Sequence, residues 1–398
     1  MASGRAGVQL VSWENWSGSV RCPQARIERP GDLSALAACV AGHTGPGALR
    51  AFGSGHSFVP FWAQGDTLLD LGAFVGLESV SSNIARLAAG TPLHAIGPLL
   101  AAEGLALANM GDIDRQTLAG AVATGTHGTG RGLGSLSSQV VAVELVDGSG
   151  KIRRLEQGND VAAARVAMGM LGVMTAIELA VVPSYGLHER NQLEGVEHCL
   201  ERFEGRLEQH RHHEFWWVPR VDQCISKTLD LVDVPAQPRL DEIPFGEAGE
   251  RFGASWQIFP SSRDLKFNEM EYAVPIAAAM ECFRAVRMRM LQDFPRLMWP
   301  VEYRVLAGDD GWLSPTVGGE VATLSIHQAA DVDQIPLFNA IEPILRDHGG
   351  RPHWGKQHGL DGAALKTLYP RFAEFCRYRR QLDPEGRFLT PYLAERFA

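Results

Sequence analysis

Residues 120–134 read GAVATGTHGTGRGLG, in which glycines and other small residues alternate with threonine and a single histidine. So little side-chain bulk allows the backbone to lie directly against a large flat or phosphate-bearing ligand. A flexible loop is the simpler alternative, but Val122, Thr124 and Thr126 are not residues typical of linkers. The stretch therefore predicts a backbone that binds a ligand.

A second glycine cluster, GSGHS at residues 53–57, directly follows the predicted strand ALRAF at 48–52. Glycines in such a turn let backbone N–H groups point toward an anion such as a phosphate. The cluster is not a Walker loop, because no Lys-Ser or Lys-Thr follows, and Phe58 breaks the pattern G-x-G-x-x-G. A plain tight turn is the alternative for this cluster taken alone.

Length and charge bound the class of protein. A chain of 398 residues suggests two to three domains. The formal net charge of −9 argues against a nucleic-acid partner, because a surface that holds a phosphate backbone is usually basic. Hydrophobic residues make up 45% and charged residues 21%, which excludes disorder over the whole chain and predicts a sizeable core.

Cysteine usage and hydropathy indicate the compartment. The six cysteines are scattered without a C-x-x-C pair, which excludes a disulfide scaffold and the common zinc spacings, and predicts reduced thiols. The N-terminal residues 1–16 lack the apolar core of a signal peptide. The longest uncharged apolar run, residues 166–177, is shorter than the about 20 residues needed to span a bilayer. We therefore expect a soluble, cytoplasmic protein without a membrane span.

The pattern along the chain changes after Pro183. Before it, strands and helices are mixed: helices are expected at 32–42, 93–104 and 159–168, strands at 48–52, 67–71 and 173–182, and a hairpin at 139–155. After it, strands are expected at 213–219 and 321–328, a long loop at 233–250 and an amphipathic helix at 274–294. Residues 331–398 carry two expected helices around RPHWGKQHG.

The segment VEYRV at 301–305 carries a charge pair inside an apolar setting. If it is a strand, its period of two places Glu302 and Arg304 on one face. A buried pair that serves a substrate is one interpretation, and a surface salt bridge is the other. Lys356, next to Gly355, is by itself most simply a surface residue.

A histidine-rich segment contains residue types that bind metals, but their arrangement does not favour a metal site. His210, His212, His213 and Glu214 include metal-ligand types, but His212 and Glu214 share one strand face and the other histidines lie opposite. A metal-dependent hydrolase built on these histidines stays open as an alternative, and no residue is predicted as a metal ligand.

Six segments together carry a resemblance to a known family. They are RAFGSGHSF (50–58), NMGDIDRQTLAGAVATGTHGTG (109–130), LGVMTAIEL (171–179), EYR with WLSP (302–315), RPHWGK (351–356) and LDPEGRF (382–388). In this order the chain resembles the vanillyl-alcohol-oxidase-type FAD enzymes, and within them the sugar-lactone and alditol oxidase group. That group includes L-gulono-1,4-lactone oxidases and dehydrogenases, D-arabinono-1,4-lactone oxidases and alditol oxidases.

The resemblance implies an α+β fold in three parts. Residues 1–183 are expected to form a two-subdomain FAD-binding domain. Residues 184–330 are expected to form a cap domain with an antiparallel sheet over the flavin ring. Residues 331–398 are expected to return to the FAD-binding domain.

The resemblance also implies the FAD contacts. The cofactor lies between the two subdomains with its pyrophosphate on residues 53–57, and the histidine matching His56 is bonded covalently to the flavin in much of the group. The implied cofactor-binding residues are Gly53, Ser54, Gly55, His56, Ser57, Gly111, Asp112, Thr117, Gly120, Thr124, Gly125, His127 and Val173.

The implied reaction is the oxidation of a sugar-derived alcohol by hydride transfer to flavin N5 while the hydroxyl group loses its proton. Arg304 and Lys356 match the family's positive charges, which stabilise the incipient alkoxide and the reduced flavin. Glu302 matches the acidic partner, which orients the arginine, accepts a hydrogen bond from a substrate hydroxyl, and could act as a base if burial raises its pKa.

The substrate expectation comes from departures within the group. Asp112, Ser325 and His327 are the implied substrate-binding residues. Alditol oxidase has a serine at the position of Asp112 and a histidine at the position of Ser325, so an aldono-1,4-lactone of the L-gulono, L-galactono or D-arabinono type, oxidised at C2, is favoured. An alditol or related polyol is the alternative.

The expected electron acceptor is oxygen, with release of hydrogen peroxide. In the family the residue matching Gly111 lies beside the reactive edge of the flavin, where a methyl group blocks oxygen and glycine leaves a gap. A turn with positive φ that requires glycine is the alternative role of Gly111.

Overall fold

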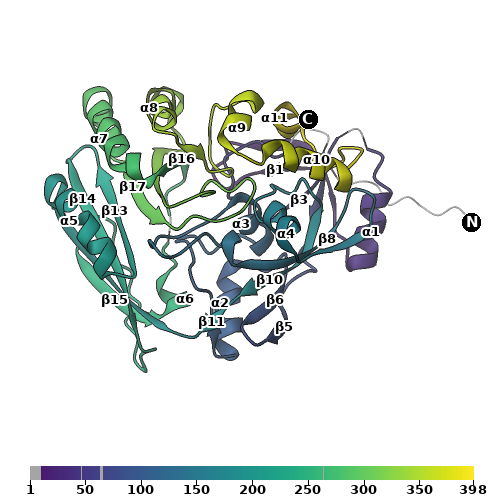
Figure 1. Ribbon diagram of the computed structural model, residues 1–398, viewed down its shortest axis with the longest axis horizontal. Helices are drawn as coiled ribbons and strands as arrows, with labels where there is room; N and C mark the ends of the chain where they lie inside the picture. The colour runs from purple at the N-terminus through teal and green to yellow at the C-terminus, as the bar shows by residue number, and fades with distance from the viewer. Residues whose placement is uncertain (1–9, 46, 63–65, 263) are drawn as a thin grey trace, which may run out of the picture.

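The structure is a computed structural model that describes residues 10–45, 47–62, 66–262 and 264–398. Its strands gather into two sheets in the N-terminal part of the chain, a two-stranded ribbon, and one large sheet that follows them (Figure 1). Helices and antiparallel strands are mixed throughout, and the predicted α+β class is confirmed. The first nine residues of the N-terminal stretch without signal-peptide character lie outside the described residues.

The first half of the chain forms the two N-terminal sheets. The first sheet has the order β1-β2-β4-β3 and contains β1 (Leu10–Glu14), β2 (Arg21–Glu28), β3 (Leu49–Phe52) and β4 (Thr67–Asp70). The second sheet has the order β5-β6-β10-β8-β9 and contains β5 (Leu77–Ser81), β6 (Ile84–Ala88), β8 (Val140–Val146), β9 (Ile152–Leu155) and β10 (Val173–Ala180). The ribbon consists of β7 (Leu105–Ala106) and β11 (Val182–Pro183). Strands β2, β4 and β3 pair in parallel, whereas every pair in the second sheet is antiparallel.

The second half forms an eight-stranded antiparallel sheet, which we call the cap sheet. Its order is β15-β12-β14-β13-β17-β18-β16-β19. Its strands are β12 (Gly186–Gly195), β13 (His212–Val218), β14 (Gln223–Val232), β15 (Gly249–Ala254), β16 (Phe267–Pro275), β17 (Val301–Leu306), β18 (Val321–Ala329) and β19 (Arg351–Pro352). The expected antiparallel sheet of the cap is therefore present.

The expected helices at 32–42, 93–104, 159–168 and 274–294 are present, whereas the helix at residues 196–209 was not expected. The helices of the described residues are α1 (Leu33–Ala41), α2 (Leu93–Ala102), α3 (Leu118–Thr124), α4 (Gly158–Ala164), α5 (Val196–Gln209), α6 (Ser255–Ile258), α7 (Ile276–Asp293), α8 (Ile335–Asp347), α9 (Gly362–Leu368), α10 (Phe372–Leu382) and α11 (Pro391–Phe397), with a short 3₁₀ turn at Ser137–Gln139. Asp32 caps α1 by accepting from the Ala35 N–H, as its position before the helix predicts.

Two local expectations differ from the structure. Part of the glycine-rich stretch is helix α3, because the Thr117 hydroxyl accepts from the Gly120 N–H and starts a turn there. Gly125, with φ of +82°, ends that helix in the left-handed conformation that glycine adopts without strain. The C-terminal part carries four helices, α8 to α11, rather than the two expected.

The two faces of the cap sheet differ sharply. On one face Phe215, Tyr303 and Tyr272 pack with Phe203 of α5 and Phe283 of α7 in a buried aromatic and apolar core. Helices α5, α7 and α8 cover this face on the outer side of the molecule (Figure 1). Because side chains alternate along strands, the other face points away from these helices, toward the N-terminal region.

The C-terminal segment contacts both parts of the molecule. Helix α8 packs on α7, and β19 pairs with β16, so the cap extends beyond the expected boundary at residue 330. Further on, the Leu49 N–H donates to the Arg387 carbonyl and the Gly148 N–H to the Leu382 carbonyl, which ties the last helices to the N-terminal sheets. These bonds support the proposed return of the chain, with the return starting after β19.

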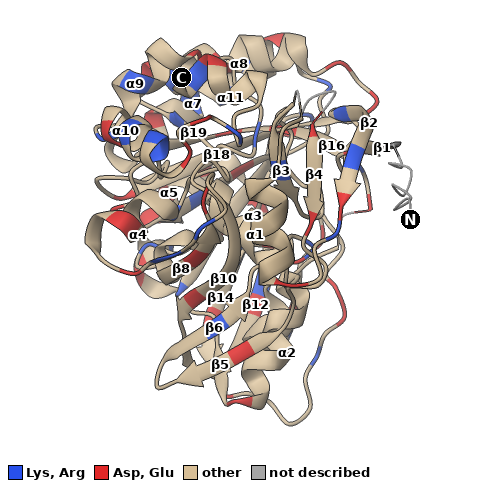
Figure 2. Cartoon of the chain, turned by 90° about the vertical axis from the view of Figure 1, so that its right-hand side faces the viewer, with Lys and Arg blue, Asp and Glu red and all other residues tan. Residues whose placement is uncertain are grey.

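Three further features concern charged residues, membrane-spanning helices and cysteines. Figure 2 shows basic and acidic residues on both β2 and its neighbouring segments, and Arg26 of β2 pairs with Glu28 of the same strand. Within the described ranges, no helix has both the length and the apolar character needed to cross a membrane. All six cysteines lie in described ranges, and no disulfide joins them.

Candidate active site

A cavity of about 230 Å³ lies between the two N-terminal sheets. Its lining comes from the end of β3 and the turn after it, from the ends of β4 and β6, from α3, and from the segment before β10. The predicted cofactor residues that line it are Gly53, Ser54, Gly55, His56, Ser57, Thr117, Gly120 and Thr124. The cavity is therefore lined by the glycine turn and by helix α3. Both lie in the glycine-rich stretches for which the sequence predicts contact with a ligand.

Close backbone packing explains the glycines that line this cavity. A Cβ atom added to Gly53 would lie 2.4 Å from the Thr117 hydroxyl, and one added to Gly90 would lie 2.5 Å from the Leu71 carbonyl. Glycine is therefore required along this wall, which exposes backbone groups and small side chains. Phe52, Phe61 and Trp62 add apolar lining. Polar backbone on one part and apolar rings on another suit a cofactor with phosphate and aromatic moieties, such as FAD.

The other predicted cofactor residues do not line this cavity. Val173 packs in the core between α1 and β8, although its neighbours Gly172 and Met174 line the cavity. Gly125 ends α3. Gly111, Asp112 and His127 lie next to the cap sheet instead: the carbonyl of His127 accepts from Arg304, and Asp112 pairs with Lys227.

His56 sits at the part-exposed edge of the cavity. Its ring stacks on Trp16 with ring centroids 5.7 Å apart. Burial, assisted by the charges of Lys356 and Arg115, lowers the pKa of His56 to about 4. The imidazole is therefore neutral near pH 7 and keeps a free lone pair on one ring nitrogen.

The polar face of the cap sheet brings the predicted catalytic acid and base together. Glu302 on β17 lies opposite Trp216 on β13 and Ser325 on β18, and Arg304 lies opposite Glu214 and Thr323. Ser325 in turn lies opposite Glu271 on β16. Opposite residues share a sheet face, so these side chains all point toward the N-terminal region.

Glu302 and Arg304 form a buried ion pair, with exposed fractions of 5% and 9%. The alternative of a surface salt bridge is excluded by this burial. Arg304 also lies 3.9 Å from Glu271, and its Nη1 donates to the His127 carbonyl. Burial alone lowers the pKa of Arg304, but the charges of Glu302 and Glu271 outweigh burial and raise the pKa, so the guanidinium stays a cation.

Lys356 is paired as well. Its ammonium donates to Glu269 on β16 and lies 5.2 Å from the centre of the Phe58 ring. The Phe58 N–H donates to the Gly355 carbonyl, so the segments 50–58 and 351–356 are in contact. Burial alone raises the pKa of Glu269, but the charge of Lys356 outweighs burial and lowers it. Lys356 is thus a paired, half-buried cation rather than a free surface lysine.

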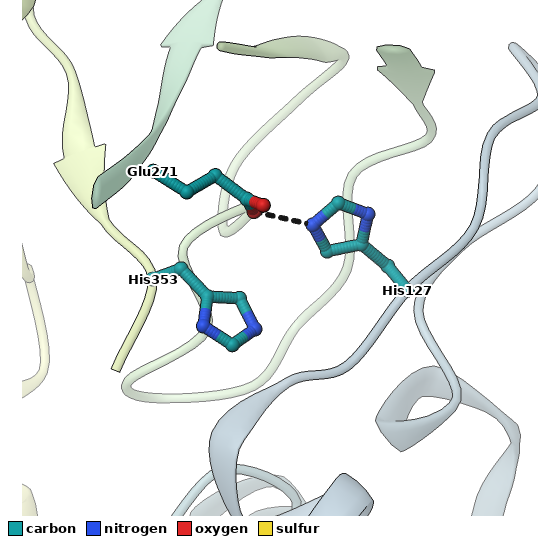
Figure 3. Close-up of side chains that lie close together, drawn as sticks. All are labelled: His127, Glu271 and His353. Carbon is teal, nitrogen blue, oxygen red and sulfur yellow. Dashed lines mark hydrogen bonds and ion pairs between the residues drawn. The ribbon is translucent and has the colours of Figure 1, made fainter. Parts of the chain in front are cut away.

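Glu271 is the centre of a second polar cluster, with His127 and His353 (Figure 3). His127 Nε2 lies 2.6 Å from one Glu271 oxygen, and the Ser325 hydroxyl donates to the other at 2.6 Å. Burial alone raises the pKa of Glu271, but the charge of His127 and its hydrogen bond hold that pKa well below its ordinary value. Both carboxylate oxygens therefore have protein partners.

His327 occupies the end of the same face. Its Nδ1 bonds the Pro300 carbonyl at 2.9 Å, and its Nε2 lies 3.7 Å from Glu269. Ser325 and His327, both predicted to bind substrate, thus contact Glu271 and Glu269, two residues apart on β16.

A third polar group joins the cap sheet to the N-terminal region. Lys227 on β14 lies 3.1 Å from Glu214 on β13 and 3.3 Å from Asp112, and only 3% of its side chain is exposed. Burial raises the pKa of Glu214 to about 7, and the negative charges of Asp112 and Glu302 add to this effect while Lys227 opposes it. One carboxylate oxygen each of Asp112, Glu214 and Glu302 lie within 4.8 Å of one another.

The histidines of the alternative metal site are not brought together. His210 pairs with Asp230 at 2.9 Å, His212 bonds the Thr129 carbonyl, and His213 bonds the Lys227 carbonyl. His212 and His213 point to opposite faces of β13. Each imidazole has its own acceptor, and the structure gives the hydrolase alternative no support.

The open gap expected beside Gly111 is wrong. A Cβ atom at this position would lie 2.7 Å from the carbonyl oxygen of His127. A positive φ is not the reason for glycine either, because Gly111 is absent from the positive-φ glycines of the described residues. Close approach of the His127 backbone is what requires glycine here.

Four site residues, Glu214, Lys227, Glu269 and Glu271, were not predicted as substrate or catalytic groups. For Glu269 and Glu271 the signal is present in the sequence, because FNEMEYAV (267–274) repeats the alternation of charge and apolar residue seen in VEYRV. Charged residues at alternate positions of a strand otherwise rich in apolar residues indicate a buried polar face.

Comparisons with known proteins agree with this geometry. A family model described as D-arabinono-1,4-lactone oxidase matches residues 177–244 and 243–396, and an FAD binding domain model matches residues 25–156. The L-gulono-1,4-lactone dehydrogenase of Mycobacterium tuberculosis H37Rv is 32% identical, over 96% of this chain and 97% of that protein. The alditol oxidase of Streptomyces sp. IKD472 is 30% identical, over 96% and 98%. The L-gulonolactone oxidase of Bos taurus is 26% identical, over 100% of both chains.

Solved structures show the same fold. A cholesterol oxidase from Brevibacterium sterolicum superposes with a TM-score of 0.85 at 15% identity, over 97% of this chain and 97% of that chain. At this identity the likeness concerns the fold alone, and it confirms the expected arrangement of an FAD-binding domain with a cap.

Proposed function

The chain belongs to the D-arabinono-1,4-lactone oxidase family and is an FAD-linked oxidoreductase that acts on CH–OH groups, and we propose that it oxidises an aldono-1,4-lactone at C2. The observation that carries this proposal is the buried Glu302–Arg304 pair on the polar face of the cap sheet. The lactone class is our inference; the relatives are named for lactones and for alditols alike.

Bound FAD supplies the acceptor for the hydride that leaves the alcohol carbon. The chain supplies fixed charge for the rest of the step. Arg304 is a buried cation at all accessible pH values, so it stabilises negative charge that develops on the substrate oxygen. Glu302 orients the guanidinium and is placed to accept a hydrogen bond from a substrate hydroxyl. Lys356, paired with Glu269, adds a second positive charge on the same side.

A lactone uses these charges more fully than a polyol. Its C1 carbonyl lies next to C2, so the C1 carbonyl oxygen, a hydrogen-bond acceptor, lies beside the C2 oxygen, on which negative charge develops as its proton leaves. Two separate cations, Arg304 and Lys356, match that demand. A polyol is the second candidate, because the carboxylates of Asp112, Glu214 and Glu302 are good acceptors for chain hydroxyls.

We also propose that His56 holds FAD covalently. Support comes from its place on the cavity wall next to the glycine turn and from its neutral imidazole, whose free lone pair makes it a nucleophile.

Oxygen is the proposed electron acceptor, with hydrogen peroxide as product. Support comes from the L-gulonolactone oxidase relatives, while the mycobacterial relative is named a dehydrogenase. Because the His127 backbone lies close to Gly111, the glycine gives no argument for oxygen access to the flavin. The proposal that oxygen is the acceptor therefore rests on these relatives.

The substrate proposal is tested with a panel of aldono-1,4-lactones and alditols, with an artificial dye as electron acceptor. We expect kcat/KM to be highest for a lactone. Turnover of alditols alone would replace the lactone proposal by the polyol one. Peroxide release in air, measured on the same samples, tests the oxygen proposal separately.

A further inference from the structure

We infer that Glu214 and Arg304 enclose a subsite for one hydroxyl group of the substrate, and that Glu214 and Lys227 are specificity-determining residues. The inference rests on the proposed function, because it takes the substrate to be a hydroxylated lactone or polyol. It adds two residues, on β13 and β14, to a site otherwise built on β16, β17 and β18.

The first observation is the register of β13 and β17. Glu214 lies directly opposite Arg304, and directly opposite side chains have Cβ atoms about 4.5–5.5 Å apart. Both are buried, with exposed fractions of 2% and 9%. Arg304 nevertheless pairs with Glu302 and Glu271, and Glu214 pairs with Lys227. Glu214 and Arg304 are therefore neighbours on adjacent strands of one buried face, yet each forms its ion pair with a different residue.

The second observation is that each residue keeps a buried polar atom without a hydrogen bond. Oε1 of Glu214 and Nε of Arg304 are buried and have no hydrogen-bond partner among the described residues. Lys227 Nζ lies 3.1 Å from Glu214 Oε1 but forms no hydrogen bond of acceptable geometry with it. Unpaired buried polar atoms are rare in folded proteins, so an acceptor and a donor on two directly opposite residues indicate a missing partner.

A hydroxyl group satisfies both atoms at once. It accepts a hydrogen bond from the Arg304 Nε–H and donates one to Glu214 Oε1. A carbonyl or ether oxygen satisfies only the arginine, and an ammonium group would be repelled by Arg304 and Lys227. These two atoms without a hydrogen bond therefore select a hydroxyl over the other groups found on a sugar derivative.

Lys227 sets the charge of this subsite. It is 3% exposed, and it lies between Glu214 and Asp112, which belong to the cap sheet and the N-terminal region respectively. Its positive charge opposes the rise in the pKa of Glu214 that burial causes and so favours the ionised, accepting form. Without Lys227, one carboxylate oxygen each of Asp112, Glu214 and Glu302 would lie within 4.8 Å of one another with one cation fewer beside them.

The test compares a substrate with analogues that each lack one hydroxyl group. The FAD-loaded wild-type protein is assayed with the best lactone or polyol of the panel and with its monodeoxy analogues. We expect one analogue to lose about ten- to hundredfold in kcat/KM, the size expected for one hydrogen bond to a charged group. In Glu214→Leu that ratio should fall close to one.

Two further variants keep the test informative if Glu214→Leu does not fold. Glu214→Gln has nearly the same shape but is a neutral acceptor, so the penalty for the missing hydroxyl should be smaller than in the wild type. Lys227→Met should weaken binding of the parent substrate more than binding of the deoxy analogue. The matched control is Glu194→Gln: the Glu194 side chain of β12 is also largely buried, is paired with Arg206 of α5, and its loss should leave the ratio unchanged.

Either of two results overturns the inference: the same hydroxyl preference in Glu214→Gln or Glu214→Leu as in the wild type, or no preference for any hydroxyl in the wild type. In both cases the two atoms bind water rather than substrate. If the wild type oxidises no lactone and no polyol, the proposed function fails instead. Calorimetric binding of the parent and deoxy compounds to the FAD-loaded protein then still tests the subsite, because it needs no turnover.

Discussion

Arg304 donates to Glu302, two residues before it on β17, and the pair is buried on the face of the cap sheet that points toward the N-terminal region. The two side chains share a face because side chains alternate along a strand. Because both are buried, they form a fixed charge pair rather than a surface salt bridge. The proposed chemistry depends on that pair.

Replacing Arg304 should lower kcat and kcat/KM together, because the charge acts on the transition state. For Arg304→Ala we expect a loss of about 3 kcal/mol, or more than a hundredfold, which is the scale of one lost oxyanion donor. Arg304→Lys keeps the charge but not the two-nitrogen fork, and should recover part of the loss. Near-normal turnover in an FAD-loaded Arg304→Ala protein would remove the residue from the mechanism.

His56 is tested by the fate of the yellow colour after acid precipitation. We expect the flavin to stay in the protein pellet of the wild type and to appear in the supernatant for His56→Ala loaded with FAD. Free flavin in the supernatant of fully loaded wild type would disprove the covalent bond while leaving FAD binding intact.

Gly111→Ala should impair turnover with oxygen and with a dye to a similar extent. The new methyl group would meet the His127 carbonyl, which also accepts from Arg304, so the shift reaches the catalytic pair. Overpacking of this kind costs about 1–3 kcal/mol of stability. Gly132→Ala, in the same glycine-rich stretch but with nothing within 4 Å of the added Cβ, is the control. Loss of turnover with oxygen alone, while dye turnover is kept, would instead indicate that residue 111 controls the access of oxygen to the flavin.

The free energy of unfolding should fall as the pH drops from about 6.5 to about 4. Burial lowers the pKa of both His212 and His213 to about 4, whereas the same histidines in the unfolded chain titrate near 6.5. In this window the unfolded chain binds more protons, so acid favours unfolding, by roughly 3 kcal/mol per histidine.

His213→Leu measures that contribution. The loss of unfolding free energy between these two pH values should be smaller in this variant by about the amount of one histidine. His198→Leu is the control, because the His198 side chain is 55% exposed. An unchanged pH slope in His213→Leu would show that His213 does not titrate in the window.

Much of the fold could be predicted because its signals are local. The cap of α1, the hairpin of β8 and β9 and the strand VEYRV depend on a few neighbouring residues and on periodicity. Helix α3 was missed because it overlaps the start of a glycine-rich stretch, although its own sequence LAGAVAT contains a single glycine and Thr117 caps its first turn.

The site residues that lie in a recognisable motif were predicted. The site residues that come together only through pairing between strands were missed. Glu302, Arg304 and Lys356 lie in quoted motifs, whereas Glu214 and Lys227 become partners only through the register of β13 and β14. A single sequence does not give the order of eight strands, so the opposition of Glu214 and Arg304 required the structure. The close approach of His127 to Gly111 is likewise a contact between loops that no local pattern encodes.

Anaerobic mixing of the purified, FAD-loaded protein with an aldono-1,4-lactone tests the proposed function most directly. We expect the visible flavin absorption to bleach on addition of the lactone, and the bleaching to be slowed more than a hundredfold in Arg304→Ala. Flavin absorption that persists with every aldono-1,4-lactone, while an alditol or another alcohol bleaches it, would contradict the assignment.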